Sequence, residues 1–167
     1  PARPTPAPPP TDQGGGCGLI GKIIYDRYLR TGLAQTRAWR EWHLLSELSQ
    51  AGFPVPRPVA ARVNRSALWY RADLMTEFIP DIEPLAEVLM RSPLPRTEWQ
   101  ALGKTIARFH RAGIHHTDLN ARNVLWRAPQ TFFLLDFDAA QKNARASQLQ
   151  SGIARLRRSL DKFSRHA

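Results

Sequence analysis

The stretch HHTDLNARN at residues 115–123, followed by LLDFD at residues 134–138, decides the fold expected of this chain. The first stretch has the spacing HxDxxxxN, and the second places an acidic residue directly after an apolar segment. Phosphoryl transfer uses this combination, because it needs a carboxylate beside the acceptor hydroxyl and oxygen ligands for Mg²⁺ in one cleft. Asp118 would supply the carboxylate, and Asn123 and Asp136 would supply the oxygen ligands.

His116 and Asp118 are the predicted catalytic residues of the first stretch. Asp118 lies in a loop after a predicted helix, where it would accept the proton of a substrate hydroxyl. His116 would brace this loop by hydrogen bonding to the backbone near Asp136. The triplet HxD by itself is more often a polar loop without chemistry. Because Asn123 and the LLDFD segment follow at the required positions, the catalytic interpretation is the stronger one.

The composition is that of one globular domain with an excess of positive charge. The 167 residues include 24 Lys and Arg against 14 Asp and Glu, which gives a net charge of +10. An anionic partner is therefore expected, and nucleic acid, an acidic membrane leaflet or a phosphorylated substrate would satisfy it. No nucleic acid is expected, because the chain has none of the basic-aromatic motifs of the known binding modules.

Cysteine content and hydropathy suggest where the protein works. The single cysteine, Cys17, excludes an internal disulfide. No apolar run approaches the roughly 20 residues of a membrane-spanning helix, so we expect a cytoplasmic protein with at most peripheral membrane association. Residues 1–16 combine prolines with a glycine run and predict an extended, disordered tail outside the domain.

The spacing of apolar residues divides the remainder into a partial N-lobe at residues 17–80 and a catalytic C-lobe at residues 81–167. The apolar stripe of the first helix consists of Trp39, Trp42, Leu45 and Leu48. Gly113 is placed to end the second helix. The predicted elements are a helix at 36–50, strands at 59–63 and 68–79, a helix at 97–112, a hairpin at 123–126 and 131–135, and a helix at 147–165.

The last predicted helix has an apolar face and a basic face. Its apolar residues are Ile153, Leu156, Leu160 and Phe163. This face would either insert into an anionic leaflet or pack on the C-lobe, and we expect packing because core burial of such residues is the commoner arrangement. In that case Arg155, Arg157 and Arg158 would be free to meet lipid or substrate phosphates.

Beyond the two motifs, the chain resembles the lipopolysaccharide sugar kinases, a protein-kinase-like family, and within it the 3-deoxy-D-manno-octulosonic acid (Kdo) kinases. The likeness covers residues 14–160, with segments in the same order and spacing. The segments are LIGKIIYDRYLRTGLAQTRAWREWHLL, GFPVPRPVAARV, YRADLMTEFIP, HHTDLNARNVL, LLDFD and ARLRRSL.

The resemblance implies an α+β, protein-kinase-like fold with a near-complete helical C-lobe and a reduced N-lobe. It implies an ATP-dependent sugar kinase that uses Mg²⁺ to phosphorylate the 4-hydroxyl of Kdo on a lipid A precursor. Such an enzyme would work as a peripheral protein on the anionic, cytoplasmic side of the bacterial inner membrane. By motif match Asp118 would be the catalytic aspartate, with Asn123 and Asp136 as metal ligands.

The sequence departs from the kinase pattern at its start. Kinases of this type cover the nucleotide with a glycine-rich hairpin and pair a strand cation with a helix glutamate. Here a proline tail precedes Gly14, so we expect the hairpin and the cation to be absent and the N-lobe to be truncated. Glu41 is either the helix glutamate, and so part of the nucleotide site, or an exposed surface residue.

Two other functions fit the same residues. One is a small-molecule kinase of the aminoglycoside or choline type, which also combines HxDxxxxN with an acidic strand end. The other is a degenerate kinase homologue that binds anionic lipid without turning over ATP. A GxxxxGK pattern at residues 16–22 lacks the following Ser or Thr that binds magnesium, and we interpret it as a linker.

Overall fold

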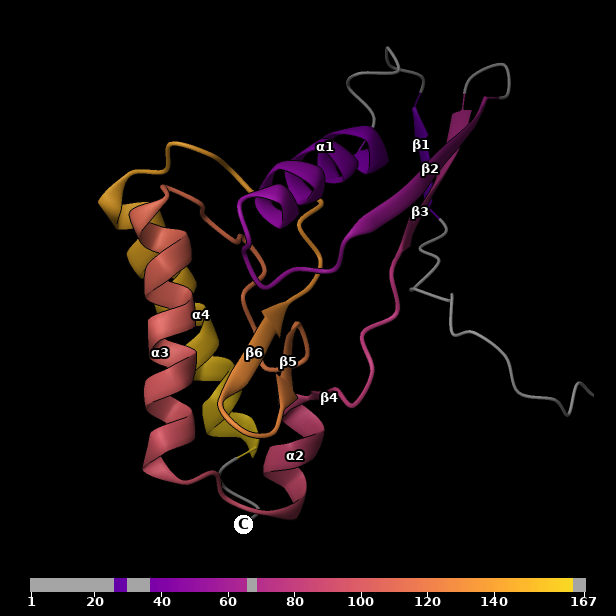
Figure 1. Cartoon of the computed structure of the whole chain (residues 1–167). Coiled ribbons are helices and arrows are strands. Elements are labelled where there is room, and N and C mark those ends of the chain that lie inside the picture. The colour runs from indigo at the N-terminus through magenta and orange to yellow at the C-terminus, as the bar shows by residue number, and fades with distance from the viewer. Residues whose placement is uncertain (1–25, 30–36, 66–68, 164–167) are drawn as a thin grey trace, which may run out of the picture.

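The computed structural model describes residues 26–29, 37–65 and 69–163, and Figure 1 shows two small sheets, one in each half of the chain. The tail predicted at residues 1–16 and the GxxxxGK pattern lie outside the described residues. The elements of the first half are β1 (Asp26–Leu29), α1 (Arg37–Gln50), β2 (Pro58–Arg65) and β3 (Trp69–Thr76). Those of the second half are β4 (Glu83–Pro84), α2 (Leu85–Arg91), α3 (Arg96–Arg111), β5 (Val124–Arg127), β6 (Thr131–Leu134) and α4 (Ala146–Phe163).

The first sheet is antiparallel with the order β1-β3-β2, and α1 packs against β2 and β3. The predicted hairpin of β2 and β3 is confirmed. The expectation that the N-lobe strands only follow the helix is wrong, because β1 precedes α1 and pairs with β3 along its whole length. This strand was missed because charged residues interrupt its short apolar pattern.

Helix α1 is confirmed, but its buried face differs from the predicted stripe. The buried residues are Ala38, Glu41, Leu44, Leu45 and Leu48. Trp39 and Trp42 are half-buried and stack on each other, with ring centroids 5.9 Å apart. A glutamate thus lies on the side of α1 that faces the rest of the protein, which the hydrophobic pattern could not indicate.

The second sheet is antiparallel with the order β4-β5-β6, and the predicted hairpin of β5 and β6 is confirmed. The predicted helix α3 is confirmed: it buries Leu102, Ile106 and Phe109, leaves Trp99 partly buried, and ends where expected. Gly113 has a φ of +69°, and the next amide, that of Ile114, donates to the Phe109 carbonyl. This is the Schellman arrangement that glycine favours, and it turns the chain into the 115–123 loop.

The final helix α4 packs on the C-terminal half, as expected, but not with its whole apolar face. Leu156 is buried, and Leu160 and Phe163 are partly buried against the same core. Ile153 is 48% exposed, so its predicted burial is wrong. α4 also packs against α2. No helix among the described residues is long and apolar enough to span a bilayer.

One apolar cluster joins the two halves of the molecule. It contains Leu44, Leu45 and Leu48 of α1 together with residues of the second half such as Phe109 and Phe137. The connection between the sheets runs from Thr76 to Glu83, and the predicted lobe boundary after residue 80, which falls in it, stays a prediction. The architecture is α+β and kinase-like, with one helix and one small sheet in the described first half.

Candidate active site

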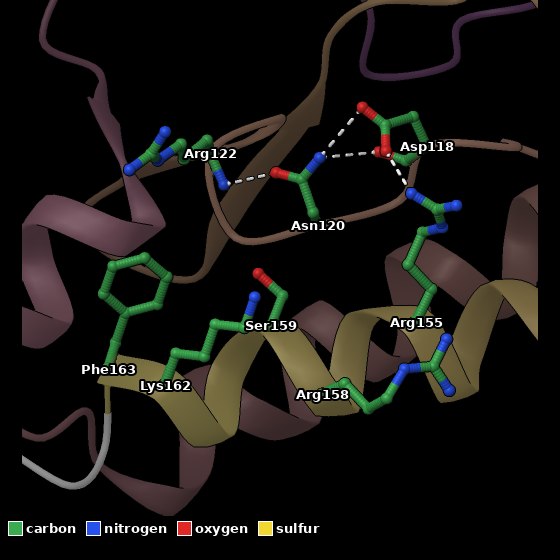
Figure 2. Close-up of a pocket in the computed structure, with 8 residues that line it drawn as sticks. All are labelled: Asp118, Asn120, Arg122, Arg155, Arg158, Ser159, Lys162 and Phe163. Carbon is green, nitrogen blue, oxygen red and sulfur yellow. Dashed lines mark hydrogen bonds and ion pairs between the residues drawn. The ribbon is translucent and has the colours of Figure 1, made fainter.

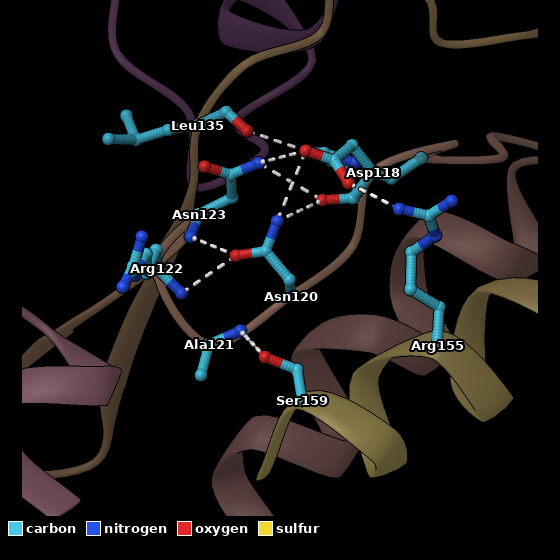
Figure 3. Close-up of polar contacts among 9 residues, drawn as sticks. Asp118, Asn120, Ala121, Arg122, Asn123, Leu135, Arg155 and Ser159 are labelled. Carbon is cyan, nitrogen blue, oxygen red and sulfur yellow. Dashed lines mark hydrogen bonds and ion pairs between the residues drawn. The ribbon is translucent and has the colours of Figure 1, made fainter. Parts of the chain in front are cut away.

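The 115–123 loop is held in shape by Asn120, a residue that the motif spacing did not single out. Its Oδ1 accepts hydrogen bonds from the backbone amides of Arg122 and Asn123, at 2.8 and 3.2 Å. Its Nδ2 donates to the backbone oxygen and to Oδ2 of Asp118, at 3.0 and 3.1 Å. Asparagine favours such local turns, and this one fixes the position of Asp118 (Figure 3).

The carboxylate of Asp118 is held from two sides. Its Oδ2 also accepts from Nδ2 of Asn123 at 3.2 Å, and its Oδ1 accepts from Nη1 of Arg155 at 2.7 Å (Figure 3). Arg155 lies on α4, so the last helix contributes to this site. The expectation that Arg155 would be free is wrong, because the loop packs against α4 and places Asp118 within reach of the guanidinium.

Asn123 and Asp136 are brought together by the β5–β6 hairpin, as the sequence predicted. The amide of Leu135 donates to the Asn123 carbonyl at 2.9 Å, which extends the strand pairing by one residue and puts Asp136 directly beyond it. Asp136 has a φ of +68°, a left-handed conformation that departs from the extended strand before it. Strained backbone of this kind is common at functional sites.

The donor set at this position fits a hard divalent cation. Asn123 uses its side-chain nitrogen to hold Asp118, which leaves its Oδ1 without a partner among the described residues. An amide oxygen beside an aspartate carboxylate is a ligand pair that Mg²⁺ accepts, with water and phosphate oxygens completing its shell. The described residues contain no cluster of three His, Cys, Asp or Glu that would form an all-protein metal cage.

His116 braces the loop through the hydrogen bond that was predicted for it. Its Nε2 lies 2.7 Å from the Leu135 carbonyl, and a carbonyl only accepts, so Nε2 carries the proton. The ring is buried and packs on Phe137, with centroids 4.8 Å apart. Burial lowers the pKa of His116 below its usual value, although the hydrogen bond to Leu135 opposes this shift. The imidazole therefore donates to the Leu135 carbonyl, and burial disfavours its charged form.

Glu41 is buried, which decides against its interpretation as an exposed surface residue. It is 6% exposed, and its Oε1 accepts a hydrogen bond from the Phe137 amide at 3.1 Å. Glu41 and Asp136 line the same small cavity between the two halves, together with Leu45, Pro56, Leu74, Thr76 and Leu135. The structure therefore brings these two predicted nucleotide-site carboxylates into one cleft.

Asp118 also lines a second, larger cavity on the other side of the loop. This basic pocket has a volume of about 440 Å³ (Figure 2). Its lining residues are Asp118, Asn120, Arg122, Arg155, Arg158, Ser159, Lys162 and Phe163. The Ser159 hydroxyl accepts from the Ala121 amide at 3.1 Å and so ties α4 to the loop. The 115–123 loop and the segment after β6 thus carry residues of a basic pocket and of an acidic cleft, respectively.

The sequence interpretation missed several residues of the basic pocket. Asn120 carried a usable signal, because an asparagine two residues after the aspartate favours a local turn. Ser159 and Lys162 carried none, because on a basic amphipathic helix such residues are expected to face solvent. The roles assigned to Asp118, His116, Asn123, Asp136 and Glu41 stay predictions.

Known proteins are similar to this chain in sequence and in fold. The profile of the family described as "Lipopolysaccharide kinase (Kdo/WaaP) family" matches residues 17–166. The "3-deoxy-D-manno-octulosonic acid kinase" of Vibrio parahaemolyticus is 42% identical over 145 residues, covering 87% of this chain and 61% of that protein. The protein of the same name from Haemophilus influenzae strain PittGG is 40% identical over 150 residues, covering 87% and 62%.

A solved structure supports the fold alone. The crystal structure of monomeric WbdD matches with a TM-score of 0.53 and 23% identity, over 76% of this chain and 30% of that one. The chain spans about three fifths of the length of the curated relatives that it matches. Because the family profile covers most of the sequence, the chain belongs to the lipopolysaccharide kinase (Kdo/WaaP) family.

Proposed function

We propose that this chain takes part in lipopolysaccharide core synthesis by transferring the γ-phosphoryl group of ATP to a hydroxyl of Kdo. The observation that carries the proposal is the position of Asp118. Its carboxylate is fixed by Asn120 and Asn123 and lines the basic pocket. Family membership and the names of the relatives support the same reaction.

The acidic cleft would hold the nucleotide. Asn123 and Asp136 would bind Mg²⁺, which supplies charge neutralisation for the phosphates of ATP. Glu41 supports this side of the site, because it holds the Phe137 amide and thereby the backbone that carries Asp136. His116 holds the same backbone at Leu135. Both sides of Asp136 are thus anchored before any ligand binds, which lowers the cost of ordering the metal ligands.

The basic pocket would hold the acceptor sugar. Asp118 would orient the acceptor hydroxyl and take its proton as the oxygen–phosphorus bond forms and ADP departs. We propose the 4-hydroxyl of Kdo on a lipid A precursor as the acceptor. The net charge of +10 fits peripheral work on the anionic, cytoplasmic side of the inner membrane.

A transfer assay tests this function. The full chain is incubated with Mg²⁺, ATP labelled at the γ-phosphate and a Kdo-bearing lipid A precursor, and label in the lipid is measured. We expect label with wild type and almost none with Asp118→Asn. Labelling of an aminoglycoside or of choline in place of the lipid would support the small-molecule kinase. Binding of Mg·ATP by calorimetry without any transfer would support a degenerate homologue.

A further inference from the structure

Three cations of the basic pocket have no acidic partner among the described residues. Arg155 is paired with Asp118, but Arg122, Arg158 and Lys162 form no ion pair with any described carboxylate. Unpaired like charges that line one concave surface repel each other and raise the local positive potential. The pocket is therefore prepared for an anionic group that is not part of the described chain.

The spacing along α4 strengthens this interpretation. Arg155, Arg158 and Lys162 lie three and four residues apart along α4, and all three line the pocket, with Arg155 reaching Asp118 of the loop (Figure 2). Like charges at such spacing destabilise an isolated helix, so helix stability does not explain their arrangement. Arg157 on the same helix is exposed like Arg158 and Lys162, but it does not line the pocket.

The pocket also limits how far the anionic group lies from the reacting hydroxyl. Asp118 and the unpaired cations line the same cavity of about 440 Å³, a size that suits one or two sugar rings. A carboxylate attached directly to the sugar ring would therefore reach the cations while a hydroxyl of that ring faces Asp118. A phosphate farther along a lipid acceptor would have to fold back to do the same.

We infer that the basic pocket is a carboxylate subsite for a sugar acid, in which Arg158 and Lys162 bind the carboxylate and thereby select the acceptor. The inference rests on the proposed function and specifies its acceptor side. Arg122 comes from the loop and not from α4, and its charge adds to the positive potential of the pocket (Figure 2). Arginine and lysine bind carboxylates through charge-assisted hydrogen bonds, and the Ser159 hydroxyl has a hydrogen left to donate.

Two measurements on the full chain test the subsite. Calorimetry gives the Kd for free Kdo and for its carboxamide, and initial rates give KM for the Kdo-bearing precursor and for ATP. We expect Arg158→Gln and Lys162→Gln each to weaken Kdo binding and raise the acceptor KM by roughly ten- to hundredfold, with the ATP KM unchanged. Arg157→Gln is the matched control and should behave as wild type.

The carboxamide identifies the group that is bound. It should bind wild type about as weakly as Kdo binds the Arg158→Gln/Lys162→Gln double variant. Equal binding of Kdo and carboxamide overturns the inference, and so does equal Kdo affinity of the pocket variants and Arg157→Gln. If removing the phosphate from the precursor weakens its binding to wild type, while replacing the carboxylate by the carboxamide does not, the cations bind a lipid phosphate instead.

The outcomes also separate the subsite from the reaction. If wild type binds Kdo through these residues but transfers no phosphate, the subsite stands and the proposed function fails. Transfer with an acceptor KM that the pocket variants leave unchanged would support the function and overturn the subsite. If wild type does not bind Kdo at all, the subsite is wrong.

Discussion

The acidic side and the basic side of the candidate site are built by different means. On the acidic side, His116 and Glu41 are buried and hold backbone groups on either side of Asp136. On the basic side, Asp118 and Arg155 are 48% and 51% exposed and meet through their side chains alone. The comparison teaches that the predicted metal side is set by buried contacts to the backbone, whereas the basic pocket is formed by side chains of a separate helix.

Asp118 lines the basic pocket and is hydrogen-bonded to Asn123, a predicted metal ligand, so its substitution should have the largest effect. Asp118→Asn keeps the shape of the side chain but removes the base, and we expect kcat to fall by about 10²- to 10⁴-fold. Thermal unfolding should be nearly unchanged, because the residue is half exposed. Turnover within a factor of two of wild type would contradict the assignment, with Arg157→Gln as the control for surface changes.

Asp136 tests the acidic side alone. Asp136→Asn removes a charged metal ligand, so we expect Mg·ATP to bind more weakly by on the order of 10²-fold. Calorimetry with Mg·ATP measures this, and binding of free Kdo serves as the internal control because it depends on the basic side. An equal loss of affinity for Mg·ATP and for Kdo would mean that the two sides are not independent.

Arg155 tests the basic side without removing the base. Because the pair with Asp118 is half exposed, it adds little to folding stability, and its main effect is to orient the carboxylate. Arg155→Gln should lower kcat by on the order of tenfold and reduce the salt sensitivity of the rate. Arg155→Lys should recover part of the rate. A lowered melting temperature with an unchanged kcat would assign Arg155 a structural role instead.

The smallest effect is the pH dependence of stability. Burial lowers the pKa of His110 and of His115 from the usual 6.5, and His115 adds to the shift of His110. The unfolded chain therefore binds protons more readily, and the free energy of unfolding should fall as pH drops through about 6.5. Urea titrations at about pH 7.5 and about pH 5.5 measure this decline. His115→Gln should make this decline of stability with pH shallower. An unaltered decline would contradict a contribution from His115.

The acidic side was largely predictable from the sequence because its geometry is local. Asn123 and Asp136 flank a hairpin, and strand pairing alone brings the ends of a hairpin together. The brace from His116 to the same backbone followed from the motif. Glu41 stayed ambiguous, because its burial depends on how α1 packs against the segment after β6, which lies far along the chain.

The basic side was not predictable, because it depends on packing between segments that lie far apart in the chain. An amphipathic pattern indicates which face of α4 is apolar, but it does not indicate what lies opposite the polar face. Arg155 was therefore expected to be free, although it meets Asp118, and the pattern did not indicate that Arg158 lines the same pocket. Strand β1 was missed because four residues with two charges give too short a pattern to recognise.

The hydrogen bond from the Ala121 amide to the Ser159 hydroxyl, with the Arg155–Asp118 pair, has a consequence for recognising relatives in genomes. A search that scores only the HxDxxxxN and acidic-strand signatures would accept a reading frame with a stop codon before α4. Such a gene product would keep every signature residue and have nothing opposite Asp118. Pseudogenes of this kind are therefore best screened by asking whether the reading frame extends through residue 163.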